Sequence, residues 1–411
     1  MRAAAPLLLA ALLMGCAGAP KTSEPATVGF LERAHEDVEN DVRVRAAVPS
    51  AAETRALFGV PLYARGVQPV WLEIENGRDE PVSFVAVGVD PEYFTPIEVA
   101  SLQSSKADES LMRRFLSQGM ETRIEPGETR SGFVFTRLDE GTKTFNVDVV
   151  WKAGVTNLTF FIPVPGLKLD HHEVDWDNLY PPDQTVELSE QDLIAAIERQ
   201  ACCTTNKSGK GSGDPLNLIV IGDLDDVYYA FIRAGWDETE TIHRSSLLKT
   251  MQSFFTGGEY RYSPVSGLYV FGRTQDIALQ KARDNIHERN HLRLWMSPAR
   301  FQGKPVWIGQ ISRDIGVRFA RQTITTHKID PDVDETREFL LEDLAYSQSL
   351  AKFGYAGGVG AASLEGQRSN LTGDPYFTDG YRLVLWVSSK PVDIADVEFV
   401  PWAEPSAHLD E

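Results

Sequence analysis

The chain has few cysteines, a shortage of positive charge and no long apolar run, and each of these excludes a class of protein. Three cysteines in 411 residues cannot form the disulfide framework of a small secreted domain. Lysine and arginine number 40 against 59 aspartates and glutamates, a formal net charge of −19. Such a surface repels a phosphate backbone, so a nucleic-acid partner is not expected. No apolar stretch reaches the roughly 18 residues that a membrane-spanning helix needs.

The amino terminus has the features of an export signal. Arg2 supplies a positive charge, a short apolar stretch follows, and the sequence Leu-Met-Gly-Cys ends at Cys16. This tetrapeptide resembles the bacterial lipobox, in which the cysteine receives diacylglycerol and a peptidase then cuts before it. We therefore predict that residues 1–15 are a lipoprotein signal peptide and that Cys16 is lipidated. An ordinary secretory signal cleaved near Ala19 is the alternative.

The predicted anchor also predicts a location. Each acyl CH₂ group buried in a bilayer contributes about 0.8 kcal/mol, so fatty acids such as palmitate hold a protein on a membrane without a spanning helix. Ala17, rather than aspartate, follows the cysteine. In Gram-negative lipoproteins this pattern favours transfer to the outer membrane. We expect an envelope protein whose partner is the membrane itself, reached through the lipid.

The first domain, residues 68–165, is predicted to be an all-β sandwich of immunoglobulin-like type. Apolar and polar residues alternate along it, which is typical of strands with one buried face. The alternating apolar positions are Val70, Leu72 and Ile74, then Val85, Val87 and Val89, then Phe145, Val147 and Val149. Turn residues such as Asn76 and Gly77 separate the strands. One helix is expected at Glu109–Gln118.

The second domain, residues 214–390, is predicted to be α+β with a mixed sheet, because strands and helices follow one another in no fixed order. The main expected elements are a strand at Leu216–Ile221, a helix ending at Ala234, a helix at about Ser245–Phe255, a long helix at Asp334–Lys352 and a strand at Leu383–Val387. The acidic, glycine-containing residues 166–213 are interpreted as a linker with a short helix at Glu190–Gln200. Residues 16–67 are interpreted as a tether and amino-terminal segment, and residues 391–411 as a tail.

Several motifs of the second domain occur in an order that resembles the carboxy-terminal domain of LssY-type bacterial membrane proteins. They are Asp214-Pro215-Leu216-Asn217, Ser263-Pro264-Val265-Ser266, Phe271-Gly272-Arg273, Asp276, His291-Leu292-Arg293-Leu294-Trp295 and the run from Thr326 to Asp334. In LssY this domain is attached to a membrane-embedded phosphatidic acid phosphatase domain of type 2. The Pro-Ser-Gly-His motif of that phosphatase is missing, and Ala320 stands where its third motif has serine. The resemblance therefore implies a domain of unknown activity and not a phosphatase.

Two segments of the second domain carry candidate site residues. On a predicted strand, His291, Arg293 and Trp295 share one face. His327 and Asp330 precede a helix amino terminus, where backbone N–H groups favour an anion. If the segments are neighbours, they converge with two further arginines. The resulting predictions are metal ligands His291, His327 and Asp330, catalytic residues His327 and Asp330, and ligand-binding residues Arg273, Arg293 and Arg313. Purely structural roles are the alternative.

Two other features have more than one interpretation. The acids from Asp330 to Glu335 are not an EF-hand, because Glu335 and Leu341 stand where glycine and a bidentate glutamate are required. Asp332 and Glu335 instead predict a helix capping box. Cys202 and Cys203 are adjacent, with Cα atoms about 3.8 Å apart across a trans peptide, which is closer than ordinary disulfides allow. Two buried thiols and a vicinal disulfide both stay open.

The combined prediction is a lipid-anchored envelope protein that serves as a binding or structural accessory module. Its expected partners are the membrane and either an envelope protein or a lipid-like ligand. The alternative is a metal-assisted hydrolase of a phosphoryl or acyl ester, with a divalent metal held in the region of His291, His327 and Asp330. The sequence leaves open whether the protein is an enzyme.

Overall fold

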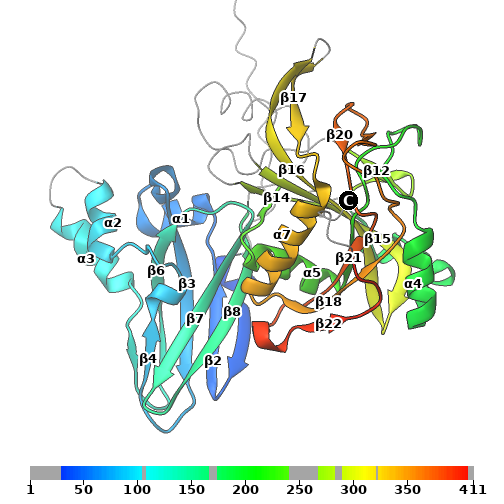
Figure 1. Ribbon diagram of the computed structural model, residues 1–411. Helices are drawn as coiled ribbons and strands as arrows, with labels where there is room; N and C mark the ends of the chain where they lie inside the picture. Colours follow the sequence, from blue (N-terminus) through cyan, green and yellow to red (C-terminus); the bar gives the residue numbers. More distant parts are fainter. Residues whose placement is uncertain are drawn as a thin grey trace, which may run out of the picture.

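The computed structural model describes residues 29–103, 108–165, 174–239, 267–282, 289–320 and 323–405. The predicted signal peptide with Cys16 and the predicted helix at Ser245–Phe255 lie outside these residues. The described part forms a β-sandwich followed by an α+β domain, as predicted (Figure 1).

The sandwich consists of two four-stranded sheets in which every ladder is antiparallel. One sheet has the order β1 (His35–Glu39), β2 (Val42–Ala47), β3 (Val67–Asn76) and β6 (Thr129–Arg137), and the other β5 (Arg123–Ile124), β4 (Val82–Val85), β7 (Thr142–Trp151) and β8 (Gly154–Pro163). The domain begins earlier than the predicted residue 68, because β2 supplies fully buried Val42 and Val44 to the core between the sheets. The alternation in β2 is too short to be distinctive by itself.

Three helices, α1 (Ala51–Phe58), α2 (Pro96–Gln103) and α3 (Glu109–Gln118), cover part of the other face of the first sheet. Phe58 of α1 and Phe115 of α3 stack with ring centroids 5.2 Å apart. The α3 helix has the predicted bounds, because Asp108 accepts hydrogen bonds from the backbone N–H groups of Ser110 and Leu111 and so caps its first turn.

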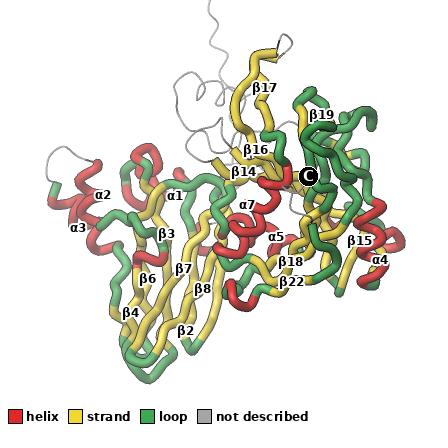
Figure 2. Tube along the Cα trace, in the orientation of Figure 1, coloured by secondary structure: helices red, strands yellow, loops and turns green. Residues whose placement is uncertain are grey.

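The second domain is built on a ten-stranded mixed sheet with helices on both faces (Figure 2). The strand order is β11 (Asp237–Glu238), β14 (Ile277–Ala282), β15 (Arg289–Phe301), β16 (Lys304–Ala320), β10 (Leu218–Ile221), β21 (Arg382–Val387), β18 (Leu350–Ala356) and β22 (Glu398–Val400), with β17 (Thr323–Ile329) paired to β16 and β9 (Val186–Leu188) paired to β15. Helices α5 (Leu224–Arg233) and α7 (Val333–Tyr346) pack on one face, and α4 (Glu190–Arg199) packs on the other. Two small hairpins complete it: β12 (Tyr269–Val270) with β13 (Arg273–Thr274), and β19 (Arg368–Ser369) with β20 (Pro375–Tyr376).

The interpretation of residues 166–213 as a linker is wrong for their described part from Val186 onward. Strand β9 pairs in parallel with β15, and α4 buries Leu193 and Ile197 against the sheet. The fully buried guanidinium of Arg382 donates to the carbonyl oxygens of Ile197, Gln200 and Ala201. These bonds satisfy carbonyl groups at the end of α4 that have no partner within the helix. Most polar side chains of this segment are exposed, so its composition resembles that of a linker although Leu193 and Ile197 are buried. The predicted tail likewise contributes β22, which pairs with β18.

Several contacts join the two domains among the residues that the structure describes. Thr142 of β7 donates its backbone N–H and its hydroxyl to the two carboxylate oxygens of Glu238, over 2.6 and 3.1 Å. Phe161 of β8 stacks on Tyr229 of α5, with 4.1 Å between ring centroids, and the guanidinium of Arg233 lies over the same phenylalanine ring. These contacts couple the sandwich to the α5 side of the second domain.

Candidate functional site

A layer of buried polar side chains covers part of one face of strands β14, β15 and β16. Its members, which we call the polar layer, are Gln280, Arg289, His291, Arg293, Gln310, Ser312 and Asp314, and all are buried. The register pairs Gln280 with His291 and His291 with Ser312. Paired residues on neighbouring strands point to the same face of the sheet, so these side chains lie side by side. Leu292 and Leu294 face the α5 and α7 side, so the predicted separation of the two faces is confirmed.

His291 is held by a carboxylate inside this layer. Its Nε2 lies 2.6 Å from Oδ2 of Asp314. Burial lowers the pKa of His291 to about 4, although Asp314 acts in the opposite direction, and the nearby guanidinium groups of Arg289 and Arg293 lower it further. The imidazole is therefore neutral at ordinary pH, and the Asp314 contact fixes its orientation.

The two arginines of the layer each donate to a side-chain amide. Arg293 donates to Oε1 of Gln310 and Arg289 donates to Oε1 of Gln280, each over 2.7 Å. Among the described residues, the Nε group of Arg289 and the Nε2 group of Gln310 have no hydrogen-bond acceptor. Each of these buried donors could form a hydrogen bond to an ordered water or to an oxygen atom of a bound group.

Arg273 and Arg313, the other two predicted ligand-binding arginines, lie away from this layer. Arg273 forms a two-bond pair with Asp276, both at 2.8 Å, and also donates to the hydroxyl of Tyr180 and the carbonyl oxygen of Met296. Arg313 lies on the opposite face of the sheet, over the ring of Phe339 in α7. The predicted convergence is therefore wrong for these residues. Arg313 follows Ser312 and so points to the opposite face of the sheet, and Arg273 belongs to the separate β12–β13 hairpin.

His327 is also displaced from His291, whereas the backbone N–H of Asp330 donates to the carbonyl oxygen of Arg313, next to the Ser312 that pairs with His291. The backbone of His327 pairs with Val317, whereas His291 pairs with Ser312, five positions earlier on β16. At 3.3 Å per residue this is about 16 Å along the strand, too far for a shared metal ion. Asp330 accepts from the backbone N–H of Asp332 over 3.1 Å. The described residues contain no group of three or more His, Cys, Asp or Glu side chains that could hold a metal ion.

The acids that follow Asp330 have structural roles. Asp332 accepts from the N–H groups of Asp334 and Glu335, which confirms it as the cap of α7. The N–H of Asp332 donates to Asp330 and not to Glu335, so the reciprocal bond of the predicted capping box is not formed. Asp334 is buried and binds Thr378 and Arg337, a contact with the far end of the chain that the sequence did not indicate. Burial raises the pKa of Asp334, and the Arg337 charge opposes that increase.

An open groove of about 550 Å³ lies between the segment before α4 and the β15–β16 hairpin. Its lining residues are Trp176, Leu179, Tyr180, Pro182, Thr185, Glu187, Met296, Ser297, Ala299, Arg300 and Pro305. The register of β15 shifts between Met296 and Arg300, where Pro298 cannot donate to a ladder. The Arg273–Tyr180–Met296 contacts fix one wall. We did not predict this groove; its only sequence signal is the aromatic and proline-containing run before β9.

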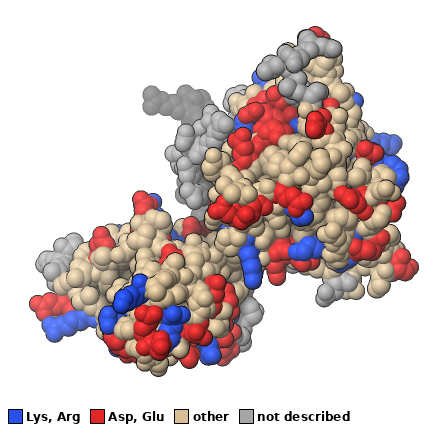
Figure 3. All heavy atoms as spheres, turned by 60° about the horizontal axis from the view of Figure 1, so that its bottom comes forward, with Lys and Arg blue, Asp and Glu red and all other residues tan. Residues whose placement is uncertain are grey.

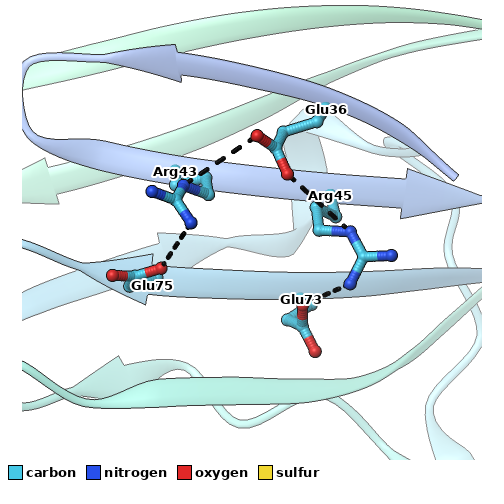
Figure 4. A pocket seen from close by; sticks show the side chains of 5 residues that line it. All are labelled: Glu36, Arg43, Arg45, Glu73 and Glu75. Carbon is cyan, nitrogen blue, oxygen red and sulfur yellow. Dashed lines mark hydrogen bonds and ion pairs between the residues drawn. The ribbon is translucent and has the colours of Figure 1, made fainter.

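A second, smaller hollow of about 180 Å³ lies on the outer face of β1, β2 and β3 (Figure 4). Its five charged side chains pair with one another: Arg43 with Glu36 and Glu75, and Arg45 with Glu36 and Glu73. Acidic and basic side chains are similarly interspersed on the sandwich surface in Figure 3. Exposed pairs of this kind contribute about 0–1 kcal/mol each and leave little charge for a ligand.

Comparison with known proteins identifies the second domain. Residues 194–381 match the family model for the LssY C-terminus. The resemblance predicted from the sequence is thereby confirmed. No curated protein matches the chain. The LssY C-terminal match begins inside α4 and includes the polar layer and the Met296–Pro305 wall of the groove, whereas the wall from Trp176 to Glu187 lies outside it. No helix in the described ranges is long and apolar enough to cross a membrane.

Proposed function

We propose that the protein is a lipid-anchored envelope lipoprotein whose LssY C-terminal domain is a binding module, and that the groove beside β15 receives a lipid-like ligand. The observation that carries this proposal is the groove itself. Its volume of about 550 Å³ lies in the range of roughly 300–1,000 Å³ that is usual for small-molecule sites. The lipobox-like sequence ending at Cys16 supports the anchor.

The lining of the groove favours an amphipathic ligand. Trp176, Leu179 and Met296 supply apolar surface, and Arg300 and Glu187 supply charge at its rim. Trp176 packs edge-on against the fully buried Trp307, with ring centroids 5.7 Å apart, so its position is fixed by the core. A preformed apolar wall of this kind lowers the entropic cost of binding.

The polar layer supports a binding module over a hydrolase. His291 is oriented by Asp314, the arginines bind amides, and the register separates His291 from His327. These contacts give His291, Arg289 and Arg293 structural roles in the sheet. No arrangement among the described side chains favours the hydrolase alternative.

The test is a titration of the full-length chain carrying Cys16→Ser with a dansyl-labelled fatty acid, since that substitution removes the competing acyl chains. We expect saturable binding that Met296→Ala and Thr185→Trp weaken roughly tenfold, by removing apolar contact or by filling the groove. Leu116→Ala, at an exposed position of the sandwich, is the matched control and should bind as the parent does. Equal affinity for all four proteins would overturn the assignment of the groove.

A further inference from the structure

Cys202 and Cys203 form a vicinal disulfide, with Cα atoms 3.7 Å apart. The bond lies directly after the end of α4, whose cap is Gln200. The second cysteine begins a turn back towards β10, because Cys203 forms a β-bridge with Pro215. The pair therefore stands where the helix is joined to the central sheet.

The two sulfur atoms have different surroundings. Cys202 is half-buried, whereas Cys203 is 6% exposed. The Sγ atom of Cys203 lies 3.6 Å from the hydroxyl of Tyr376, a fully buried residue of β20. A thiolate from solution can therefore reach the sulfur of Cys202 more readily than that of Cys203. If the S–S bond breaks, the released sulfur of Cys203 lies beside the Tyr376 hydroxyl.

The backbone on both sides of the pair is bound by groups from distant elements. The carbonyl oxygens of Gln200 and Ala201 each accept from Arg382 over 2.9 Å, and the carbonyl oxygen of Cys202 accepts from the N–H of Leu216 over 2.7 Å. A change in the conformation of the Cys202–Cys203 peptide would act directly on these three bonds. It would act in turn on the attachment of α4 to β21.

We propose that Cys202–Cys203 is a redox-active site that exchanges with dithiol proteins and that its reduction loosens the end of α4. A thiolate of the dithiol attacks Sγ of Cys202, the S–S bond breaks, and Cys203 leaves as a thiolate that accepts a hydrogen bond from Tyr376. The second thiol of the partner then attacks the mixed disulfide. The products are two cysteine thiols and an oxidised partner, a transfer of two electrons and two protons. This site does not depend on what the groove binds.

The first test measures accessibility of the bond in the folded, full-length protein. Dithiothreitol serves as the dithiol probe, N-ethylmaleimide traps thiols at intervals, and peptide mapping separates Cys202 and Cys203 from Cys16. We expect no label on the pair before reduction and two labels after it. A pair already present as thiols in protein isolated without reductant, or a disulfide reduced only after unfolding, would overturn the proposal.

The role of Tyr376 distinguishes exchange at this site from simple exposure. Tyr376→Phe removes the hydrogen bond to the departing thiolate and should slow reduction about fivefold, as expected for loss of one hydrogen bond of ordinary strength. Tyr346→Phe, a hydroxyl removed from a residue that is 81% exposed, is the control and should leave the rate unchanged. Equal rates for the two variants would exclude the proposed assistance.

The second test asks whether reduction loosens α4. Hydrogen exchange of the intact protein should become at least severalfold faster at the amides from Ile197 to Leu216 on reduction, and the double variant Cys202→Ser with Cys203→Ser should show the same pattern without reductant. Amides of the sandwich serve as the internal reference. Unchanged exchange at Ile197–Leu216 in both samples would overturn the coupling.

Discussion

The carboxylate of Glu238 in the second domain accepts both the backbone N–H and the hydroxyl of Thr142 in the sandwich. Glu238 is 2% exposed, and burial raises its pKa to about 7 in spite of these two bonds. A buried carboxyl group thus lies in the contact between the domains.

Glu238 should make the stability of the protein depend on pH. Its pKa is raised from 4.5 to about 7 on folding, so the folded state holds more protons between these values and this contribution to stability falls as pH rises through them. The shift corresponds to at most about 3 kcal/mol. The free energy of unfolding of the native protein minus that of Glu238→Gln should therefore decrease between about pH 4.5 and pH 7, as measured by denaturant titration.

A difference measurement is needed because His291 acts in the opposite direction. Its pKa is lowered from 6.5 to about 4 on folding, so its contribution to stability is lost as pH falls through that window. Glu121→Gln, at an exposed position, is the matched control. A flat profile for Glu238→Gln would contradict the raised pKa.

Arg382→Leu should strongly destabilise the second domain. The guanidinium donates to the carbonyl oxygens of Leu216, Gln200 and Ala201 among others, and burial lowers its pKa to about 10. Removing it leaves several buried acceptors without donors, a loss of about 3 kcal/mol or more. Denaturation followed by circular dichroism would measure this, with Arg300→Leu in the groove rim as control. Equal stability of the two variants would show that water replaces the guanidinium.

His291→Ala should lower stability without changing the metal content. The substitution leaves the buried Asp314 carboxylate without its imidazole contact, at a loss of about 1–3 kcal/mol, and His291→Asn should recover part of it. Elemental analysis by mass spectrometry is expected to give equal metal content for the native protein and both variants. About one equivalent of metal that disappears in both His291→Ala and His327→Ala would instead support the hydrolase alternative.

Cys16→Ser should abolish acylation. Cells grown with radioactive palmitate are expected to label the native protein and the Cys202→Ser variant equally, and to leave Cys16→Ser unlabelled and released from membranes. Label that persists in Cys16→Ser would rule out the lipoprotein anchor.

Local features of the chain were predictable because neighbouring residues determine them. The bounds of α3 follow from the Asp108 cap and an apolar face that buries Phe115, and Asp332 caps α7 by the same logic. The two faces of β15 could be assigned from period-two alternation, and the motif order identified the LssY C-terminal domain before any contact was known.

Only the tertiary structure decided which distant residues meet. Strand register placed Asp314, and not His327, beside His291, and a shift of one position would have moved each side chain to the other face. The polar segment before β10 resembled a linker because the donor that completes it, Arg382, lies more than a hundred residues later in the sequence. The sequence determined the local elements and the family, since these depend on near neighbours; the groove, the buried polar layer and the environment of the disulfide depend on register and packing across the whole sheet.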